Sequence, residues 1–189
     1  MLTEYELNNL ENGYYFNNKY LIASGFGGSV YKINNKYVVK KLCSSWKYFK
    51  NEFKTTIILS NYCLSPKVIY HSKKNDKFRF FVMEKLDYTL YYMLKNKIFL
   101  DFHLGKLKNI LHKLNKTKYI HMDLHFNNIM WSNYYNDFRI IDWEQYYITN
   151  NYNKNQYTRL INKSIYLMNN EFKVYKCFGF KIFKLRCLN

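Results

Sequence analysis

The chain has a single proline, Pro66, and only six glycines among its 189 residues. This scarcity excludes a proline-rich or glycine-rich linker and a collagen-like repeat. Hydrophobic residues make up 48% of the sequence, which is enough to bury a sizeable core. We therefore expect one folded domain over residues 1–189 and not a disordered chain.

Long hydrophobic runs are also absent. The longest, such as FRFFVM and TTIIL, are far shorter than the ~20 residues needed to cross a bilayer. The opening MLTEYELNNLENG has acids and amides where a secretory signal has an apolar core. Closely paired cysteines, which metal sites and redox dithiols require, are missing too. We expect a reducing, cytoplasmic compartment and no membrane partner. The scattered cysteines are Cys43, Cys63, Cys177 and Cys187.

Acidic residues are few: 13, against 30 Lys and Arg, which gives a net charge of +17. Such a charge attracts nucleic acids, ATP or acidic substrates. The lysines are spread along the chain, however, and no aromatic motif of an RNA-recognition sheet is present. The abundance of Lys, Asn, Tyr, Ile and Phe is also typical of an A- and T-rich genome, as in a virus or parasite. We expect a solvated basic surface and no nucleic-acid partner; for a viral gene, the compartment is the host cytoplasm.

The first part of the chain reads as an antiparallel sheet with one helix. Apolar residues alternate with polar ones in several short runs, and GFGG and Asn34-Asn35 supply turns between them. Over residues 44–62, apolar side chains recur at helical intervals instead. The predicted strands are 20–24, 29–33, 36–42, 67–71 and 77–84.

The pattern changes near residue 86. From 87 to 118, Leu, Ile, Tyr and Met recur every three or four residues, which predicts two helices with a break near Asp101. NNIMW and FRIIDW then predict short strands joined by the turn-rich SNYYND. Residues 157–168 predict one more helix, and residues 172–185 an apolar, basic tail of strand or helix. The fold class is therefore α+β.

The glycine turn ASGFGGSVYK could approach a phosphate closely, because Gly25, Gly27 and Gly28 leave backbone N–H groups unobstructed. The same glycines are also compatible with a simple hairpin tip. Strand alternation places Lys40 on the face of Val38, where its ammonium could reach phosphates.

A semi-buried ammonium needs a counter-charge, and Glu52 on the following helix is the best-placed acid. Local pairing of Glu52 with Lys47, Lys50 or Lys54 on the helix surface is the alternative.

The segment YIHMDLHFNNIMW places polar groups between apolar flanks. Asp123 on a rigid loop would serve as a general base for an acceptor hydroxyl. Asn128 would bind a divalent cation through its amide oxygen. Asp142 follows an apolar strand and could hold Mg²⁺ against nucleotide phosphates.

Taken in order, these segments resemble the protein kinase superfamily over about residues 18–145. GFGGSVYK looks like the glycine-rich loop, YVVK like the strand lysine motif, HMDLHFNN like the catalytic loop and IDWE like the metal-binding Asp motif. The resemblance implies a bilobal kinase-like fold, with a small lobe at about 14–86 and an abbreviated large lobe at 87–189. It also implies an ATP- and Mg²⁺-dependent enzyme.

The resemblance assigns roles to individual residues. Asp123 and Lys40 would be catalytic, and Asn128 and Asp142 would bind Mg²⁺. Met83 would be the gatekeeper, the backbone of Glu84 to Leu86 would bind adenine, and Val30, Val38 and Met130 would enclose it. The implied nucleotide-binding residues are Ala23, Ser24, Gly25, Phe26, Gly27, Gly28, Val30, Val38, Lys40, Glu52, Met83, Glu84, Leu86 and Met130.

The sequence departs from the family pattern in several places. Ala23 occupies the first glycine position. Met122 replaces the catalytic-loop arginine, so we expect no dependence on phosphorylation between Tyr146 and Thr158. His125 replaces the lysine of serine/threonine kinases, and DWE replaces Asp-Phe-Gly. DWE together with His-x-Asp, at His121–Asp123, is reminiscent of aminoglycoside and choline phosphotransferases.

The leading hypothesis is a serine/threonine protein kinase with a protein substrate. The alternatives are a small-molecule alcohol kinase, suggested by DWE, and a non-catalytic kinase mimic that inhibits cellular kinases, suggested by the shortened large lobe. No Ala-Pro-Glu sequence occurs in residues 145–189.

Overall fold

The computed structural model describes residues 2–25, 27–43, 46–144 and 146–148. The chain divides into two compact units, Met1–Asn151 and Tyr152–Asn189. The second unit lies wholly outside the described residues, as do the predicted helix at 157–168 and the tail at 172–185. The described part is α+β, in agreement with the prediction.

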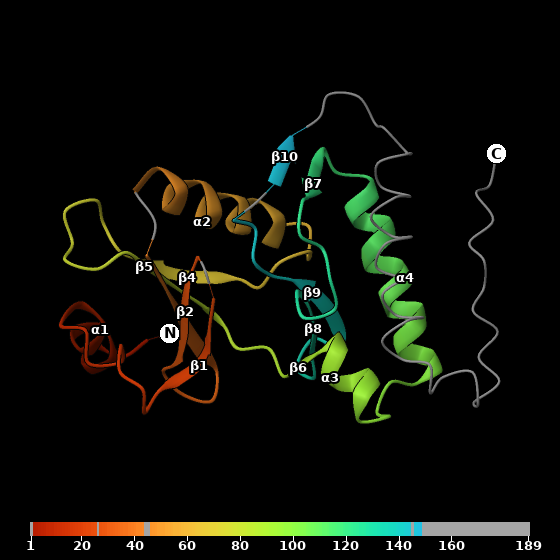
Figure 1. The fold of residues 1–189 in the computed structure, drawn as a ribbon, viewed down its shortest axis with the longest axis horizontal. Helices are drawn as coiled ribbons and strands as arrows, with labels where there is room; N and C mark the ends of the chain where they lie inside the picture. The colour runs from red at the N-terminus through yellow and green to blue at the C-terminus, as the bar shows by residue number, and fades with distance from the viewer. Residues whose placement is uncertain (1, 26, 44–45, 145, 149–189) are drawn as a thin grey trace. The chain divides into compact units, whose positions relative to one another are not determined.

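A five-stranded antiparallel sheet forms the first part of the chain, with the strand order β1-β2-β3-β5-β4 (Figure 1). Its strands confirm those predicted, except that β5 starts later because the residues before it form a turn. In this turn the Lys73 N–H donates to the Asp76 carboxylate at 2.6 Å. The strands are β1 Leu21–Ser24, β2 Gly28–Lys32, β3 Tyr37–Leu42, β4 Val68–His71 and β5 Phe80–Glu84.

Each face of this sheet is covered by its own apolar cluster, because successive strand residues point to opposite sides. Val39 of β3 packs in one cluster with Leu10 of helix α1 (Glu4–Glu11). Val38 packs in the other with Phe53 of helix α2 (Trp46–Ser60). The two helices accordingly lie on opposite sides of the sheet (Figure 1).

Helix α2 was expected from the sequence, but α1 was not. Its start is fixed by a reciprocal capping box, in which the Glu6 N–H donates to Thr3 Oγ1 at 3.2 Å. The Thr3 N–H donates to Glu6 Oε2 at 2.8 Å. The signal was present in the sequence as T-x-x-E at Thr3–Glu6.

The second part of the described chain contains the two predicted helices and two small sheets. Helix α4 packs His103, Leu107, Ile110 and Leu114 inward at the three- and four-residue spacing of one helix face. Strands β8 and β9 confirm the predicted strands, whereas β6, β7 and β10 were not predicted. The elements are β6 Tyr88–Thr89, α3 Leu90–Lys95, α4 Asp101–Asn115, β7 Tyr119–His121, β8 Ile129–Ser132, β9 Asp137–Ile140 and β10 Tyr146–Ile148.

The pairing of these strands brings two loops together. The small sheets have the orders β6-β8-β9 and β10-β7. Since β7 precedes the 122–128 loop and β10 follows the 141–144 segment, pairing of Tyr146 with His121 holds the two loops side by side.

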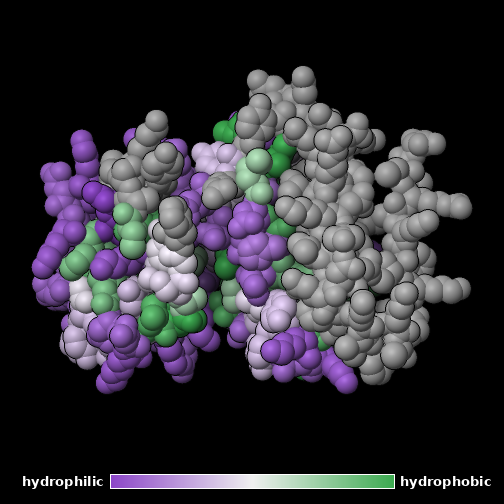
Figure 2. All heavy atoms as spheres, viewed as in Figure 1, coloured by the Kyte–Doolittle hydropathy of each residue, from purple (hydrophilic) through white to green (hydrophobic). Residues whose placement is uncertain are grey.

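The outer surface is mixed in character. On the face seen in Figure 2, hydrophilic side chains predominate over the described part, and apolar ones form small separate areas. Edge strand β1 contributes exposed apolar side chains, Leu21 and Ile22. Within the described ranges, none of the helices has the length and apolar character that crossing a membrane requires.

Candidate functional site

Lys40 lies at the centre of an ion-pair cluster formed by three distant parts of the chain. Its ammonium is 2.5 Å from Glu52 Oε1 and 2.6 Å from Asp142 Oδ1. The Lys40 and Glu52 side chains are only 9% and 1% exposed. The predicted Lys40–Glu52 pair therefore forms, in place of local pairing on the surface of α2. Asp142 joins it from 102 residues further along the chain.

The protonation energetics of this cluster are not symmetric. Burial alone would lower the pKa of Lys40, but the Glu52 and Asp142 carboxylates outweigh it and hold that pKa above its usual value. Burial raises the pKa of Glu52, and the Lys40 charge opposes this only in part. One reason is that Glu52 Oε2 is buried with no hydrogen-bond partner among the described residues. The pKa shift of Lys40 therefore favours its ammonium form, whereas burial acts against the charged form of Glu52.

Asp142 has an unusual backbone conformation. Its φ is 65°, in the left-handed region that only Gly, Asn and Asp adopt with any ease. The side chain remains 40% exposed despite its contact with Lys40. Strain of this kind is maintained where the surrounding structure requires one particular direction of a side chain. Here it directs the carboxylate toward Lys40.

The 122–128 loop is fixed by hydrogen bonds of Asn128. Asn128 Nδ2 donates to the Asp123 carbonyl at 2.9 Å, and the Ile141 N–H donates to the Asn128 carbonyl at 3.0 Å. Since the amide nitrogen is used in this way, the amide oxygen of Asn128 remains as an acceptor. The arrangement brings Asn128 and Asp142, the two predicted metal ligands, onto neighbouring, directly bonded segments.

His121 is a site residue that the sequence interpretation missed. Its Nε2 lies 2.9 Å from the Ile141 carbonyl, and its Nδ1 lies 3.2 Å from the Asp123 backbone nitrogen, which donates to it. Nε2 therefore carries the proton and donates to Ile141. Burial lowers the pKa of His121, so the imidazole is neutral. One ring thus spans the loops of Asp123 and Asp142.

Trp143 is the second missed residue. It is fully buried, donates from Nε1 to the Ile140 carbonyl at 3.1 Å, and its ring lies 4.6 Å from that of His121. The available signal was the position of both residues, because His121 stands two residues before Asp123 and Trp143 stands directly after Asp142.

The predicted general base faces solvent. The Asp123 side chain is 62% exposed, and its Oδ2 lies 3.5 Å from His125 Nε2. His125 Nδ1 accepts from the Asn127 N–H at 3.2 Å, so in the neutral ring Nε2 carries the proton and points to Asp123. Met122 is 56% exposed.

The glycines of the β1–β2 turn have three different environments. A Cβ on Gly28 would overlap the Lys41 carbonyl oxygen, so this glycine is needed for strand packing. A Cβ on Gly27 would overlap the Glu144 carboxylate, whereas one on Gly25 would meet nothing within 4 Å. Phe26 lies outside the described residues. Ala23 and Ser24 are exposed, and the Ser24 hydroxyl is 2.8 Å from that of Ser29.

The predicted adenine-binding residues lie mainly on the α2 side of the sheet. Val30 is half-buried beside Val38, and Met83 pairs with Val38 across β3 and β5. Met130 is half-buried on β8, where it pairs with Thr89 and Arg139.

The backbone of the predicted hinge is partly engaged already. The N–H groups of Glu84 and Lys85 donate to the Lys67 and Lys36 carbonyls. The N–H of the buried Leu86 has no partner among the described residues, which leaves it available to a ligand.

The Glu84 side chain is engaged in two other hydrogen bonds. It accepts a backbone bond from Lys67 at 3.0 Å and a hydrogen bond from the Tyr135 hydroxyl. Burial and this hydrogen bond raise the pKa of Tyr135 to about 12. Tyr135, on the β8–β9 turn, therefore ties that turn to the end of β5.

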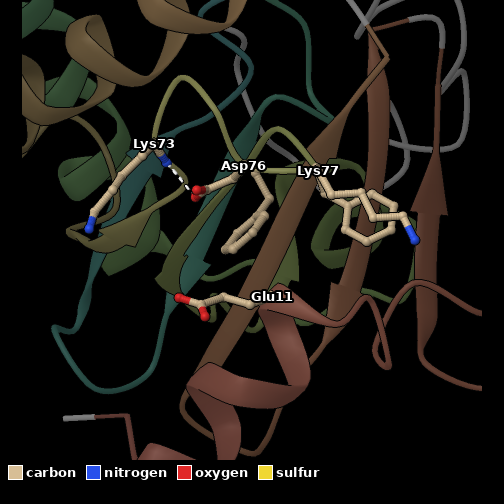
Figure 3. A pocket seen from close by; sticks show the side chains of 6 residues that line it. Glu11, Lys73, Asp76 and Lys77 are labelled. Atoms are coloured by element: carbon tan, nitrogen blue, oxygen red, sulfur yellow. Dashed lines mark hydrogen bonds between the residues drawn. The ribbon is translucent and has the colours of Figure 1, made fainter.

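A separate hollow of about 270 Å³ is lined by Glu11, Lys73, Asp76, Lys77, Phe78 and Phe80. Figure 3 shows the Glu11 and Asp76 carboxylates beside it. Phe80 belongs to the cluster on the α1 side of the sheet, opposite Lys40, and no predicted site residue lines the hollow. In the described part of the chain, no three His, Cys, Asp or Glu side chains are grouped so as to hold a metal ion.

Comparison with known proteins adds no family to this geometry. No protein-family model matches the chain, and no curated protein is significantly similar to it.

Proposed function

We propose that the protein is an ATP- and Mg²⁺-dependent phosphotransferase with a kinase-like bilobal fold, whose acceptor is a serine or threonine hydroxyl of a protein. The observation that carries this proposal is the meeting of Lys40, Glu52 and Asp142, which come from β3, α2 and the segment after β9. A buried ammonium held by two carboxylates is suited to neutralising phosphate charge. The left-handed backbone of Asp142 supports the proposal because it directs the carboxylate toward Lys40.

The described residues fit a Mg²⁺–nucleotide complex. Asn128 offers an amide oxygen and Asp142 a partly exposed carboxylate, and Mg²⁺ is commonly held by one or two carboxylates together with phosphate oxygens and water. The small number of protein ligands is consistent with the absence of a three-residue cluster from the described ranges. When bound, the metal–nucleotide complex supplies the transferable phosphoryl group and charge neutralisation.

The roles of this chain's own residues follow from their positions. Lys40 binds and orients phosphate oxygens. Asp123, held by the Asn128 and His121 bonds, accepts the proton of the acceptor hydroxyl. His121 keeps the two loops in register. Phosphoryl transfer depends mainly on such positioning and on electrostatic stabilisation.

The first experiment measures nucleotide binding. Wild-type protein should be stabilised against thermal unfolding by ATP with Mg²⁺, since a ligand that binds only the folded state raises its stability. Lys40→Met and Asp142→Asn should lose that shift. The result that would overturn the proposal is an unchanged melting temperature of the folded wild-type protein at millimolar Mg²⁺–ATP.

A second acceptor class is favoured by one observation. Trp143 and Glu144 follow Asp142, and His121 stands two residues before Asp123, so that DWE occurs together with His-x-Asp, which resembles the aminoglycoside and choline phosphotransferases. Incubation with labelled ATP and either casein-like proteins or amino alcohols separates the two classes. Transfer to small alcohols alone would replace the protein acceptor by a small molecule.

The non-catalytic alternative makes an opposite prediction for Asp123. A mimic that only binds cellular kinases does not need this carboxylate. Asp123→Ala would then leave the biological effect of the protein unchanged, whereas a phosphotransferase loses it.

A further inference from the structure

We propose that Glu144 is an electrostatic gate at the glycine turn, which selects metal-bound nucleotide over free nucleotide. The inference rests on the proposed function. It starts from the position of the Glu144 carboxylate. A Cβ on Gly27 would overlap all three atoms of this group, Cδ, Oε1 and Oε2. The carboxyl group therefore lies directly against the Gly27 backbone.

The Glu144 carboxylate lies near other acids. Among the described residues, no hydrogen bond or ion pair holds the Glu144 side chain. Its charge also acts on Glu52, whose environment already includes Asp142. Lys40 is paired with Glu52 and Asp142, and Glu144 adds a third carboxylate, whose charge acts on Glu52. The chain as a whole carries +17, but these three acids outnumber the one ammonium that is bonded to two of them.

The two acids of the DWE segment have different partners. Asp142 is bonded to Lys40 at 2.6 Å, whereas Glu144 reaches across to the turn between β1 and β2. Trp143 between them is fully buried, which anchors the segment while the half-buried Glu144 extends from it. Glu144 can therefore move without disturbing the backbone of Asp142.

The Glu144 carboxylate lies where the proposed function puts phosphate groups, beneath the glycine turn. A triphosphate that enters without a cation meets this negative charge at short range, where like charges repel strongly. A triphosphate that brings Mg²⁺ supplies positive charge and lets the carboxylate turn aside. A side chain at position 27 would have to displace the Glu144 carboxylate.

The test compares ATP binding with and without metal by isothermal titration calorimetry. Wild-type protein should bind Mg²⁺–ATP and bind ATP in excess chelator far more weakly. Glu144→Gln keeps the shape of the side chain and removes the charge. We expect it to gain about tenfold in affinity for chelated ATP, which corresponds to about 1.4 kcal/mol, and to change less than about threefold for Mg²⁺–ATP.

The matched control is Glu11→Gln, which removes the same charge on the α1 side of the sheet, where Glu11 accepts a hydrogen bond from Tyr70. It should change neither affinity. Glu144→Ala also empties the space beside Gly27. Its affinity for ATP in excess chelator should rise at least as much as that of Glu144→Gln.

The outcomes separate the gate from the function on which it rests. If wild-type protein binds Mg²⁺–ATP and Glu144→Gln gains nothing for chelated ATP, the gate is wrong and the proposed function stands. If Glu144→Gln instead loses Mg²⁺–ATP affinity as Asp142→Asn does, Glu144 is a metal ligand and the gate is likewise wrong. If folded wild-type protein binds neither form, both proposals fall together.

Discussion

The two sides of the candidate site differ in how completely the fold determines them. On one side, Lys40 and Glu52 are 9% and 1% exposed and already joined to Asp142. On the other, the side chains of Asp123 and His125 are 62% and 37% exposed, with only a 3.5 Å contact between them. The first side is built from core-forming elements and has its geometry before any ligand arrives. The second side is open to solvent, so packing does not fix its side chains in one position.

Of the substitutions that distinguish the two sides, Asp123→Asn is expected to have the largest effect, which is on kcat. The side chain is mostly exposed, so the substitution should leave stability and Mg²⁺–ATP affinity unchanged. Loss of a general base typically lowers kcat by about 10²- to 10⁴-fold. Steady-state transfer assays measure kcat, and calorimetry measures nucleotide affinity. A variant with more than a tenth of the wild-type kcat would exclude Asp123 as the base.

Lys40→Met should act on the side of the site formed by Lys40 and Glu52, and its main effect should be a loss of stability. It leaves the Glu52 carboxylate buried and unpaired, and breaking such a pair costs about 3 kcal/mol of unfolding free energy. Urea unfolding measures the loss. In Lys40→Met/Glu52→Gln the uncompensated charge is gone, so most of the stability should return. Additive losses in the double variant would show that the two residues are not coupled.

The pH dependence of stability should report the buried histidines. Burial lowers the pKa of His121 and of His103 in the folded protein, so below the unfolded value of about 6.5 the unfolded state binds more protons. Stability is therefore present above that pH and is lost as the pH falls. Each histidine changes the unfolding free energy by up to about 1.4 kcal/mol per pH unit. Urea unfolding between pH 7.5 and 5 checks the slope, and His103→Gln should reduce it. Because the raised pKa of Glu52 acts in the opposite direction, the decisive result is the comparison: an equal slope in His103→Gln and wild-type protein would contradict the assignment.

The smallest effect is expected at the end of β5, where Glu84 accepts the hydrogen bond from Tyr135. Tyr135→Phe removes the hydrogen bond to Glu84 and should cost about 1 kcal/mol of unfolding free energy. Tyr134→Phe is the matched control, because Tyr134 is 87% exposed and should change nothing measurable. Equal effects of the two substitutions in thermal unfolding would show that the Tyr135 bond does not stabilise the fold.

The sequence predicted those features that depend on local pattern or on opposite charge. Alternation predicted β1 to β5, helical spacing predicted α2 and α4, and the need of a buried ammonium for an acid predicted Lys40 with Glu52. These features can be predicted from the sequence because each follows from residues close in sequence or from one strong electrostatic requirement.

The remaining features depend on tertiary contacts. Strand β7 is three residues long and exists through its pairing with β10, so no local pattern marks it. His121 and Trp143 read as ordinary apolar-flank residues until the two loops are brought together. The contact between Glu144 and Gly27 joins residues more than a hundred positions apart and follows no rule of spacing.

The packing of Trp143 against His121 has a practical consequence. An indole ring that is closed off from water changes its emission when water reaches it, and here the ring forms the anchor of the segment that carries both acids. Release of that segment is therefore visible in the intrinsic fluorescence of the protein. Substituting Trp46 and Trp131 by phenylalanine would assign the signal to a single indole, so that ligand-induced rearrangement can be followed in real time without a label.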